Sequence, residues 1–354
     1  MSDVVLVTGA FGLVGTATVA NLAARGRRVI VTDLDTPANR KAAAGLSPGV
    51  EVHWLDLTNS ASVAALLSAV QPAALVHLAA VIPPLCYSRP RLARAVNVDA
   101  TANLIDAASA LREQPRFIQA SSIAVYGPRN PHHISDVLTA DTPVRPYDVY
   151  GGHKVEAEAL VRQSGLEWVI LRLGGVLSTT APTGRDPDLA YFGALLPDDG
   201  RLHTVDVRDV AHAFATATTA DVARRVLLIG GDDSHRLRQG EIGAAMAAAM
   251  GLVGAIPSGR PGNPKDDDAW FATDWMDSAI AQRLLGYQHH SWPQMLSEIT
   301  ANTGWRRYPL RLAAPLAREF LKRRSPYYRQ PGVYADPWEA VRRKWGGPEA
   351  DRRT

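Results

Sequence analysis

The stretch Val4-Val5-Leu6-Val7-Thr8-Gly9-Ala10-Phe11-Gly12-Leu13-Val14-Gly15 decides the fold, because an apolar β-type run passes through three glycines into a helical segment. Glycine at such a turn lets the backbone approach a pyrophosphate, and the last glycine lets the helix pack closely on the strand. The helix N-terminus also offers free N–H groups to an anion. The loop from Gly9 to Gly15, with Phe11, Gly12 and Leu13 inside it, is therefore predicted to hold the phosphates of a dinucleotide.

An acidic residue follows at the end of the second predicted strand. Asp33 stands eighteen residues after Gly15, where a carboxylate can accept hydrogen bonds from both hydroxyls of an adenosine ribose. A 2′-phosphate there would meet this negative charge, so the sequence predicts NAD rather than NADP as the cofactor. Asp35 is the alternative ribose partner, but we expect it to lie in solvent.

Beyond this unit, short β-rich runs alternate with Ala- and Leu-rich helical segments. Most runs are continuously apolar, as in strands that are covered on both faces of a parallel sheet. The sequence therefore predicts an α/β fold, a doubly wound (Rossmann) parallel sheet with a smaller, mostly helical C-terminal substrate lobe. The predicted strands are 4–8, 29–33, 50–55, 74–78, 116–121, 168–173 and 226–229, and the predicted helices between them are 13–25, 60–70, 91–111, 149–163 and 206–219.

The alternation loosens after Gly174, which indicates where the domains divide. Residues 1–174 and 203–235 are expected to form the NAD-binding domain. Residues 175–202 and 236–304 are expected to form the substrate lobe, with helices at 239–250, 274–285 and 292–303. Residues 305–354 form a basic C-terminal extension that ends in a short helix, 334–345, capped by Asp336 and Pro337.

Length and composition exclude several classes of protein. A chain of 354 residues with 46% hydrophobic and 21% charged residues fits neither a disordered nor a fibrous protein. Its longest nearly apolar runs, 72–86 and 242–257, are shorter than a membrane-spanning helix requires, and its start lacks the basic segment of a signal peptide. We therefore expect a cytoplasmic protein whose single cysteine, Cys86, is a free packed thiol.

Charge is distributed unevenly along the chain. Residues 305–354 hold thirteen Lys and Arg against five Asp and Glu, a net charge of +8, which leaves −5 for the rest of the chain. The acidic body argues against nucleic-acid binding. The basic, amphipathic segment 305–329 can lie on an anionic membrane surface or dock on a partner, but Pro309 and Pro315 are expected to break it into short pieces. Packing over the body or across a dimer interface is therefore the favoured role of the extension.

Two further segments carry groups suited to proton transfer. Ser122 follows an apolar strand, and Tyr150 and Lys154 stand four residues apart at the head of a predicted helix, so both side chains project from one face. A tyrosine that acts as a base needs its pKa lowered from about 10 towards 7, which Lys154 and an oxidised nicotinamide together can supply. Ser122 would then hold the substrate oxygen by a hydrogen bond.

Together these motifs resemble the extended short-chain dehydrogenases/reductases, which include NAD-dependent epimerases, dehydratases and 3β-hydroxysteroid dehydrogenases. The resemblance covers about residues 3–300 and is completed by residues 171–173 and 207–210. It implies a catalytic trio of Ser122, Tyr150 and Lys154, with Tyr150 as the acid/base. The cofactor contacts that it implies are Asp56 and Leu57 beside the adenine, Leu78, Ala79 and Ala80 after the fourth strand, and Asn97, Tyr150 and Lys154. A helix cap at Asp56 and a buried polar anchor at Asn97 are the structural alternatives.

The chain also departs from this family in ways that narrow the reaction. Similar sugar 4,6-dehydratases carry an acidic pair just after the Ser or Thr that ends the strand, whereas this chain has Ile123 and Ala124, which argues against dehydration. Nucleotide-sugar epimerases often have an Asn after the strand that holds Arg172, where this chain reads Gly174-Gly175-Val176-Leu177. The predicted substrate lobe contains Arg185, Arg201 and Arg260, but these arginines form no clear cluster that could bind a pyrophosphate.

The residues expected around the nicotinamide favour an apolar substrate. They are residues 81–85 with Trp270, Phe271, Trp275 and Met276, for which ordinary lobe core is the alternative. We therefore predict an NAD-dependent oxidoreductase that transfers a hydride between NAD and a small-molecule substrate, a bulky and apolar secondary alcohol or ketone. The alternatives are an epimerase that retains its NAD and, less favoured, a non-catalytic NAD-sensing protein, which usually lacks the Tyr or the Lys.

The remaining candidates concern histidines and assembly. The pairs His132-His133 and His289-His290 share no helical face and have no carboxylate at ligand spacing, so we expect solvated loop residues and no metal site. His153 is expected to be a variable helix position. By analogy with similar enzymes, we expect a homodimer that pairs through the helices carrying Asn97 and Tyr150.

Overall fold

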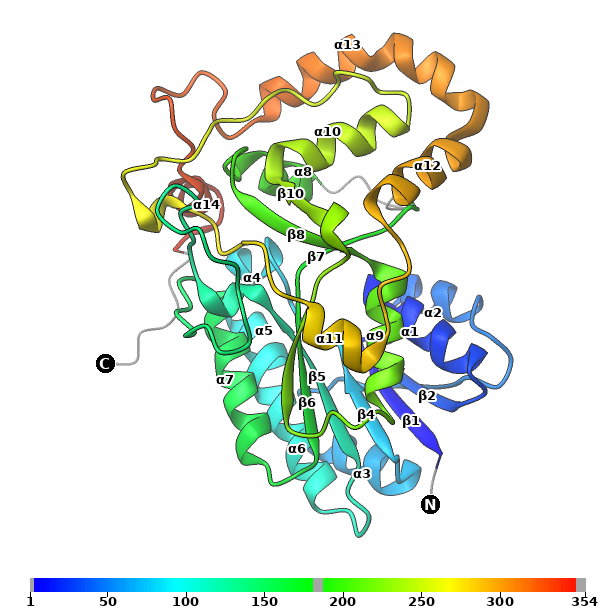
Figure 1. Ribbon diagram of the computed structural model, residues 1–354. Coiled ribbons are helices and arrows are strands. Elements are labelled where there is room, and N and C mark those ends of the chain that lie inside the picture. The colour runs from blue at the N-terminus through cyan, green and yellow to red at the C-terminus, as the bar shows by residue number, and fades with distance from the viewer. Residues whose placement is uncertain (1–2, 181–186, 348–354) are drawn as a thin grey trace.

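Strand β1 (Val4–Thr8) is an inner strand of a seven-stranded parallel sheet in the computed structural model, which describes residues 3–180 and 187–347 (Figure 1). The chain builds outward from β1 first in one direction and then in the other, so the strand order reverses between β1 and β4. This arrangement confirms the doubly wound parallel sheet, in which ligands bind beyond the carboxyl ends of the strands at such a reversal. The order is β3 (Glu51–Trp54), β2 (Arg28–Asp33), β1, β4 (Ala74–His77), β5 (Arg116–Ser122), β6 (Trp168–Leu173) and β9 (Arg225–Ile229).

Helices cover both faces of this sheet, which is why its central strands are apolar throughout. Side chains alternate along β1, so Val5 and Val7 enter one core and Val4 and Leu6 enter the other. The first core includes residues of α1 (Leu13–Ala24) and α9 (Val207–Ala217), which pack on each other. The second core includes residues of α3 (Ser60–Val70), α6 (Ala100–Ser109) and α7 (Val149–Gln163).

A lobe lies above the carboxyl ends of the main strands in Figure 1. It holds a three-stranded sheet in the order β10 (Arg236–Arg238), β8 (Arg201–Asp206) and β7 (Gly175–Leu177). Helices α8 (Pro187–Leu195), α10 (Gln239–Ala249) and α12 (Trp292–Thr303) accompany it. The lobe therefore adds a small sheet to the helices that the sequence predicts there.

Two predicted helices are shorter or less regular than expected. The segment predicted as 91–111 consists of α5 (Pro90–Arg94), a π-turn η1 (Ala95–Asp99) and α6. The helix predicted over 274–285 begins only at α11 (Ala279–Leu285), because Met276 pairs with Leu138 and its N–H contacts His203 at 3.3 Å. Two further short helices are α2 (Pro37–Ala43) and α4 (Leu85–Ser88).

The C-terminal extension forms α13 (Arg307–Arg324) and α14 (Pro337–Trp345). The expectation that prolines break the basic segment is wrong, because α13 continues through Pro315. Pro309 lies in the first turn, where a backbone N–H has no partner inside the helix anyway. The predicted last helix is confirmed, with Asp336 accepting the Glu339 N–H at 2.9 Å as its cap. Among the helices described, none is long and apolar enough to cross a membrane.

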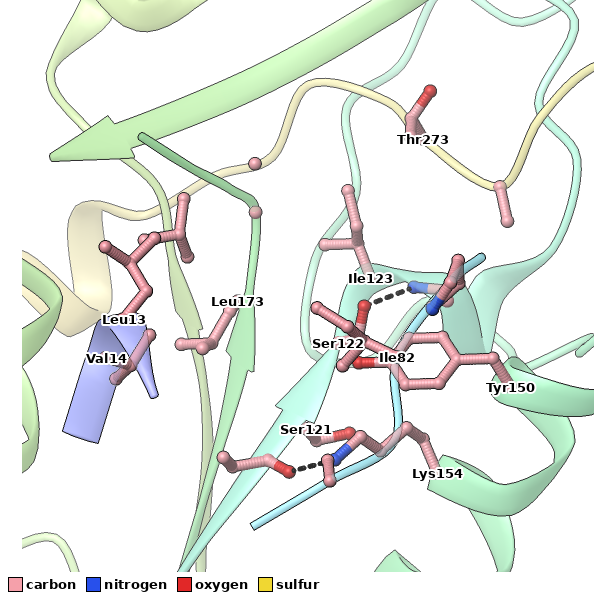
Figure 2. A pocket seen from close by; sticks show the side chains of 18 of the residues that line it. Leu13, Val14, Ile82, Ser121, Ser122, Ile123, Tyr150, Lys154, Leu173 and Thr273 are labelled. Carbon is pink, nitrogen blue, oxygen red and sulfur yellow. Dashed lines mark hydrogen bonds between the residues drawn. The ribbon is translucent and has the colours of Figure 1, made fainter. Parts of the chain in front are cut away.

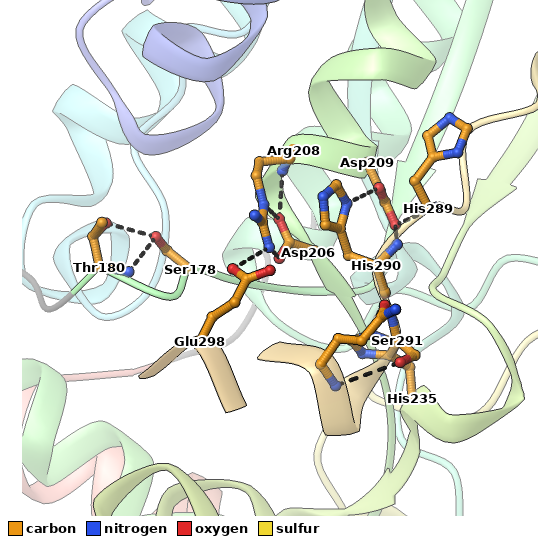
Figure 3. Close-up of polar contacts among 11 residues, drawn as sticks. Ser178, Thr180, Asp206, Arg208, Asp209, His235, His289, His290, Ser291 and Glu298 are labelled. Atoms are coloured by element: carbon orange, nitrogen blue, oxygen red, sulfur yellow. Dashed lines mark hydrogen bonds and ion pairs between the residues drawn. The ribbon is translucent and has the colours of Figure 1, made fainter. Parts of the chain in front are cut away.

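Two aspartates tie α9 to the lobe (Figure 3). Asp206 caps α9, and Arg208 bridges it to Glu298 of α12, with N–O distances of 2.7 and 2.9 Å. The buried Asp209 pairs with His290 Nδ1 at 2.6 Å and also accepts the His290 N–H at 3.1 Å. The expectation of a solvated loop residue is therefore wrong for His290, since its partner comes from a helix far away in the sequence.

Candidate active site

The loop after β1 has no room for side chains at two of its glycines. Gly9 has a φ of +65°, and a Cβ there would lie 2.5 Å from the Ala79 nitrogen. A Cβ on Gly15 would collide with the Gly9 carbonyl oxygen, so glycine is what lets α1 approach β1 this closely. Helix α1 starts after Gly12 with neither a side-chain cap nor an acidic residue in its first turn, so its first N–H groups suit an anion.

Asp33 stands beside this loop at the end of β2. Its carboxylate accepts the Phe11 N–H at 3.1 Å and the Leu34 N–H at 2.8 Å, which fixes its position next to the glycines. Asp35 instead pairs with Arg40 at the surface through bonds of 2.5 and 2.7 Å, in keeping with the expected solvent position. Of the two candidates, Asp33 is thus the carboxylate beside the glycine loop, and its contact with a ribose stays a prediction.

The segment after β4 reaches the same place. Leu78 and Ala80 line the cavity beyond the strand ends, and Ala79 packs against the glycine loop. Asn97, on the π-turn η1, holds this segment from behind, because its buried amide bonds both the N–H and the carbonyl of Val81, at 2.7 and 2.9 Å. The structure therefore places Asn97 as a buried polar anchor.

Asp56 and Leu57 are not among the residues that line the cavity. Asp56 closes a turn by accepting the Thr58 N–H at 2.9 Å, while Asn59 is the cap of α3, so the cap alternative for Asp56 is wrong. Leu57 is buried, and its carbonyl accepts the Asn103 side chain at 3.0 Å. A contact of either residue with an adenine stays a prediction.

Ser122, Tyr150 and Lys154 come together in this cavity (Figure 2). Strand β5 ends at Ser122, and helix α7 carries Tyr150 in its first turn and Lys154 one turn later on the same face. Lys154 Nζ donates to the Ala120 carbonyl at 2.8 Å and lies 5.7 Å from the centre of the Tyr150 ring. The three side chains are therefore grouped by one strand end and one helix start.

Burial shifts the pKa values of Tyr150 and Lys154. It raises the pKa of Tyr150 above its ordinary value, with Cys86 adding to the effect and the Ser122 hydroxyl opposing it. Burial also lowers the pKa of Lys154 to about 8. The lowering of the phenol pKa that is expected from Lys154 and an oxidised nicotinamide together stays a prediction. The phenol of the protein itself is protonated at neutral pH.

Asp148 fixes the start of α7 and thereby the position of Tyr150. One of its oxygens accepts the Gly151 N–H at 2.8 Å as the helix cap, and the other accepts the Tyr87 hydroxyl at 2.5 Å. Burial raises the pKa of Asp148, although both of these bonds oppose the change. Asp148 was not among the residues predicted from the sequence, although an Asp just ahead of a predicted helix is a recognisable cap signal.

The cavity has a volume of about 420 Å³ and is largely apolar away from the trio. Phe271 faces it as predicted, and Thr273 adds a hydroxyl (Figure 2). Val176, Phe192 and Leu202 also line the cavity, and the sequence did not predict this, because they come from segments distant from the trio in the sequence. The apolar side chains that line it include Ile82, Pro83, Ile123, Val176, Phe192, Leu202 and Phe271.

Three of the predicted pocket residues do not line the cavity. Trp270 and Met276 are fully buried, so the core alternative is right for these two residues. Trp275 is half-buried and packs on the guanidinium of Arg201, which lies 4.8 Å from its ring centre. Phe271 alone among the four faces the cavity.

Neither Arg201 nor Arg260 lines the cavity. Arg201 also pairs with Asp274, and Arg260 donates to carbonyls of the C-terminal extension, including that of Gln330 at 2.6 Å. Arg185 lies outside the described residues. Of the described residues that line the cavity, Lys154 is the sole cation.

The C-terminal extension supports the aromatic wall of the cavity from behind. Trp338 of α14 stacks on Phe271 with ring centres 5.1 Å apart, and its Nε1 donates to the Trp270 carbonyl at 3.1 Å. Trp345 packs against Phe192, which in turn meets Phe271 edge-on at 5.5 Å. The extension is thus part of the structure that shapes the pocket.

Comparisons with known proteins agree with this architecture. Residues 5–193 match the NAD dependent epimerase/dehydratase family. The UDP-glucose 4-epimerase of Mycoplasma genitalium is 29% identical over 191 residues, which are 51% of this chain and 54% of that protein. The chain spans about half the length of the curated relatives that it matches.

Two solved structures illustrate the breadth of similar proteins. The UDP-glucose 4-epimerase of Thermotoga maritima has a TM-score of 0.68 at 20% identity, covering 87% of this chain and 99% of its own. The L-threonine 3-dehydrogenase of Trypanosoma brucei has a TM-score of 0.68 at 24% identity, and the match covers 90% of this chain and 98% of that one. At these identities the likeness shows the fold, and the two proteins are named for different reactions.

Proposed function

The chain belongs to the NAD-dependent epimerase/dehydratase family, and we propose that it is a dehydrogenase that interconverts a bulky, apolar secondary alcohol and its ketone. NAD is the cofactor of this family. The observation that carries the proposal is the apolar cavity in which Tyr150 and Ser122 stand.

The residues of the chain fit this cofactor. The glycine loop leaves space where a Cβ on Gly9 or Gly15 would meet backbone, and the open N-terminus of α1 complements a diphosphate. Asp33 would accept the hydroxyls of the adenosine ribose, and Lys154 would bind the nicotinamide ribose. When bound, the nicotinamide supplies the hydride acceptor or donor.

The trio supplies the proton transfer. Tyr150 takes the hydroxyl proton when an alcohol is oxidised and returns it when a ketone is reduced. The Ser122 hydroxyl orients the substrate oxygen, and Lys154 places a positive charge near the phenol. Both the Tyr and the Lys are present and grouped, which speaks against a non-catalytic NAD-sensing role.

A nucleotide sugar fits the cavity less well than an apolar alcohol. The diphosphate of a nucleotide sugar would need a site apart from the helix N-terminus assigned to NAD, yet Lys154, the sole cation among the described lining residues, is engaged by the Ala120 carbonyl. Ile123 and Ala124 line the cavity where similar dehydratases carry acidic side chains. Apolar surface buried here contributes roughly 25 cal/mol per Å² to binding. These features support an apolar substrate.

The fate of the cofactor tests the proposal. Purified protein mixed with NAD and a panel of hydroxysteroids and other apolar secondary alcohols should form NADH, followed by absorbance, whereas UDP-sugars should not. An epimerase would instead keep NAD through purification, detectable by mass spectrometry after denaturation. Conversion of UDP-sugars without net NADH formation would overturn the proposal in favour of that enzyme.

Asp33→Ala should weaken NAD binding roughly 10- to 100-fold, because charge-assisted hydrogen bonds to the ribose are lost. NADP affinity should fall less or rise, since the carboxylate no longer repels a 2′-phosphate. Calorimetric titration of both cofactors measures this. Asp35→Ala is the matched control and should leave both affinities unchanged, because Asp35 is paired with Arg40 at the surface. Equal losses in the two variants would contradict the placement of the ribose.

Phe271→Ala should lower kcat/KM for large apolar alcohols roughly 10- to 100-fold, since a contact worth a few kcal/mol is removed from the pocket. Small alcohols that do not reach Phe271 should be affected much less. Steady-state kinetics on an alcohol series measures the difference. Trp275→Phe is the control, because Trp275 does not line the cavity. A uniform loss across the series would argue against a substrate contact.

We also propose that two copies pair through α7 and the segment of α5 and η1. Leu92 of α5 is 41% exposed, and Arg94 joins α5 to Glu156 of α7 at 2.9 Å, so the two elements form one surface. Light scattering should give the mass of a dimer, and Leu92→Glu should shift it towards the monomer.

A further inference from the structure

Helix α13 is attached to the body along one narrow face. Ala314 is buried, and Leu310, Ala317 and Leu321 are half-buried. These positions recur every three or four residues, so they form a single stripe along the helix. In Figure 1 the helix runs along the edge of the lobe that is farthest from the central sheet.

A second apolar stripe, the outer stripe, runs along the opposite face of α13. Leu312, Leu316 and Phe320 follow one another at intervals of four and are 83%, 77% and 54% exposed. Trp305 and Tyr308 extend the stripe at the N-terminal end, with exposed fractions of 74% and 65%. Single exposed apolar residues are ordinary, but a continuous apolar face marks an interaction surface.

Basic residues border the outer stripe on both sides. With 3.6 residues per turn, Arg311 and Lys322 fall on one border and Arg324 on the other. Helix α13 contains six Lys and Arg but a single acidic residue, Glu319, which is paired with Arg323 at 2.9 Å. As far as Leu316 this face is apolar in the middle, and at its C-terminal end the paired Glu319 and Arg323 lie on it beside Phe320. Its borders are cationic.

We propose that the outer stripe of α13 binds an anionic lipid surface, with the helix axis parallel to it. An apolar face bordered by Lys and Arg, with Trp and Tyr among its apolar residues, is the pattern of helices that lie in the interface of a bilayer. Because the helix continues through Pro315, these side chains share one continuous face. This favours a lipid surface over the role expected from the sequence, in which the extension packs over the body or across a dimer interface. A second copy of the chain is disfavoured on this face, because two helices of high positive charge would repel each other.

Co-sedimentation of the full chain with vesicles tests the proposal. We expect binding to phosphatidylcholine vesicles that contain phosphatidylglycerol, little binding to phosphatidylcholine alone, and weaker binding at high salt. Leu312→Ser with Leu316→Ser should weaken binding about tenfold or more, because two apolar groups no longer enter the bilayer. Arg311→Gln with Lys322→Gln should weaken it at low salt by roughly fivefold per charge.

Controls separate this proposal from other uses of α13 and from the proposed function. Ile280→Ser, on α11 and 49% exposed in the wild type, should bind vesicles normally. All variants should keep NAD affinity, because none of the changed residues lines the cavity, and thermal stability, because all of the changed side chains are exposed. Equal binding to neutral and anionic vesicles, or binding that ignores the leucine changes, would overturn the proposal. The proposal would also be overturned if the protein bound no vesicles and the leucine variant changed from a dimer to a monomer. The outer stripe would then be a contact between two copies of the chain.

Discussion

Replacing Tyr150 with Phe is expected to lower kcat in both directions by about 10²- to 10⁴-fold, the usual contribution of a positioned acid or base. The phenol is the acid/base of the proposed mechanism, and the ring remains in place without its hydroxyl. NAD affinity should stay nearly unchanged, because Lys154 and Asp33 keep their positions. Stopped-flow measurement of hydride transfer, with a parallel titration of NAD, gives both quantities.

The pH dependence sharpens this test. Burial raises the pKa of Tyr150, so in the wild type the fraction of deprotonated phenol, and with it the rate of alcohol oxidation, should increase as the pH rises above neutral. The residual activity of the variant should lose that dependence. Tyr287→Phe is the control, since Tyr287 is a buried tyrosine that bonds the Gly230 carbonyl outside the cavity. Full turnover in Tyr150→Phe would show that another group moves the proton.

The parts of the site that could be predicted from the sequence are those that depend on residues close together in the chain. Gly9 and Gly15 sit where a backbone has no room for Cβ, a constraint written into one strand, one turn and one helix. Tyr150 and Lys154 share a helix face, and Ser122 ends a strand of a parallel sheet, so the carboxyl edge brings them together. Periodicity and strand order therefore predict that these residues lie together, while the family resemblance is what singles them out as a trio.

Contacts between distant segments could not be predicted in the same way. Phe271 faces the cavity while Trp270 and Met276 are core, and a loop has no period that distinguishes them. His290 is held by Asp209, which lies on another element. Pro315 removes one helical hydrogen bond, but this loss alone does not decide whether α13 breaks, because the packing of Ala314 against the body also contributes.

A buried charge network supports the trio from behind. Arg172 donates to both oxygens of Glu158 at 2.8 and 2.7 Å and to the Tyr126 hydroxyl at 2.6 Å, and Ser121 donates to Glu158 at 2.6 Å. Burial raises the pKa of Glu158, but the hydrogen bonds and charge of Arg172 outweigh this and hold the pKa below its ordinary value. The network joins β5, α7 and β6. Two of these elements carry the trio.

Replacing Arg172 with Met should therefore lower the free energy of unfolding by about 3–5 kcal/mol, because it leaves the Glu158 carboxylate buried without its main partner. Arg162→Gln removes the other arginine that pairs with Glu158, and should cost less than about 1 kcal/mol because that side chain is 42% exposed, against 3% for Arg172. Urea unfolding measures both.

The double variant Glu158→Gln with Arg172→Met should be more stable than Arg172→Met alone, since no uncompensated charge then remains in the core. If Arg172→Met and Arg162→Gln lowered the free energy of unfolding by equal amounts, burial would not determine the strength of these two ion pairs. Folded Arg172→Met should also show a lower kcat with NAD affinity retained, because the network holds the strand end at Ser122 against the helix that carries Tyr150 and Lys154. A stability loss without any change in kcat would confine the network to folding and separate it from the alignment of the trio.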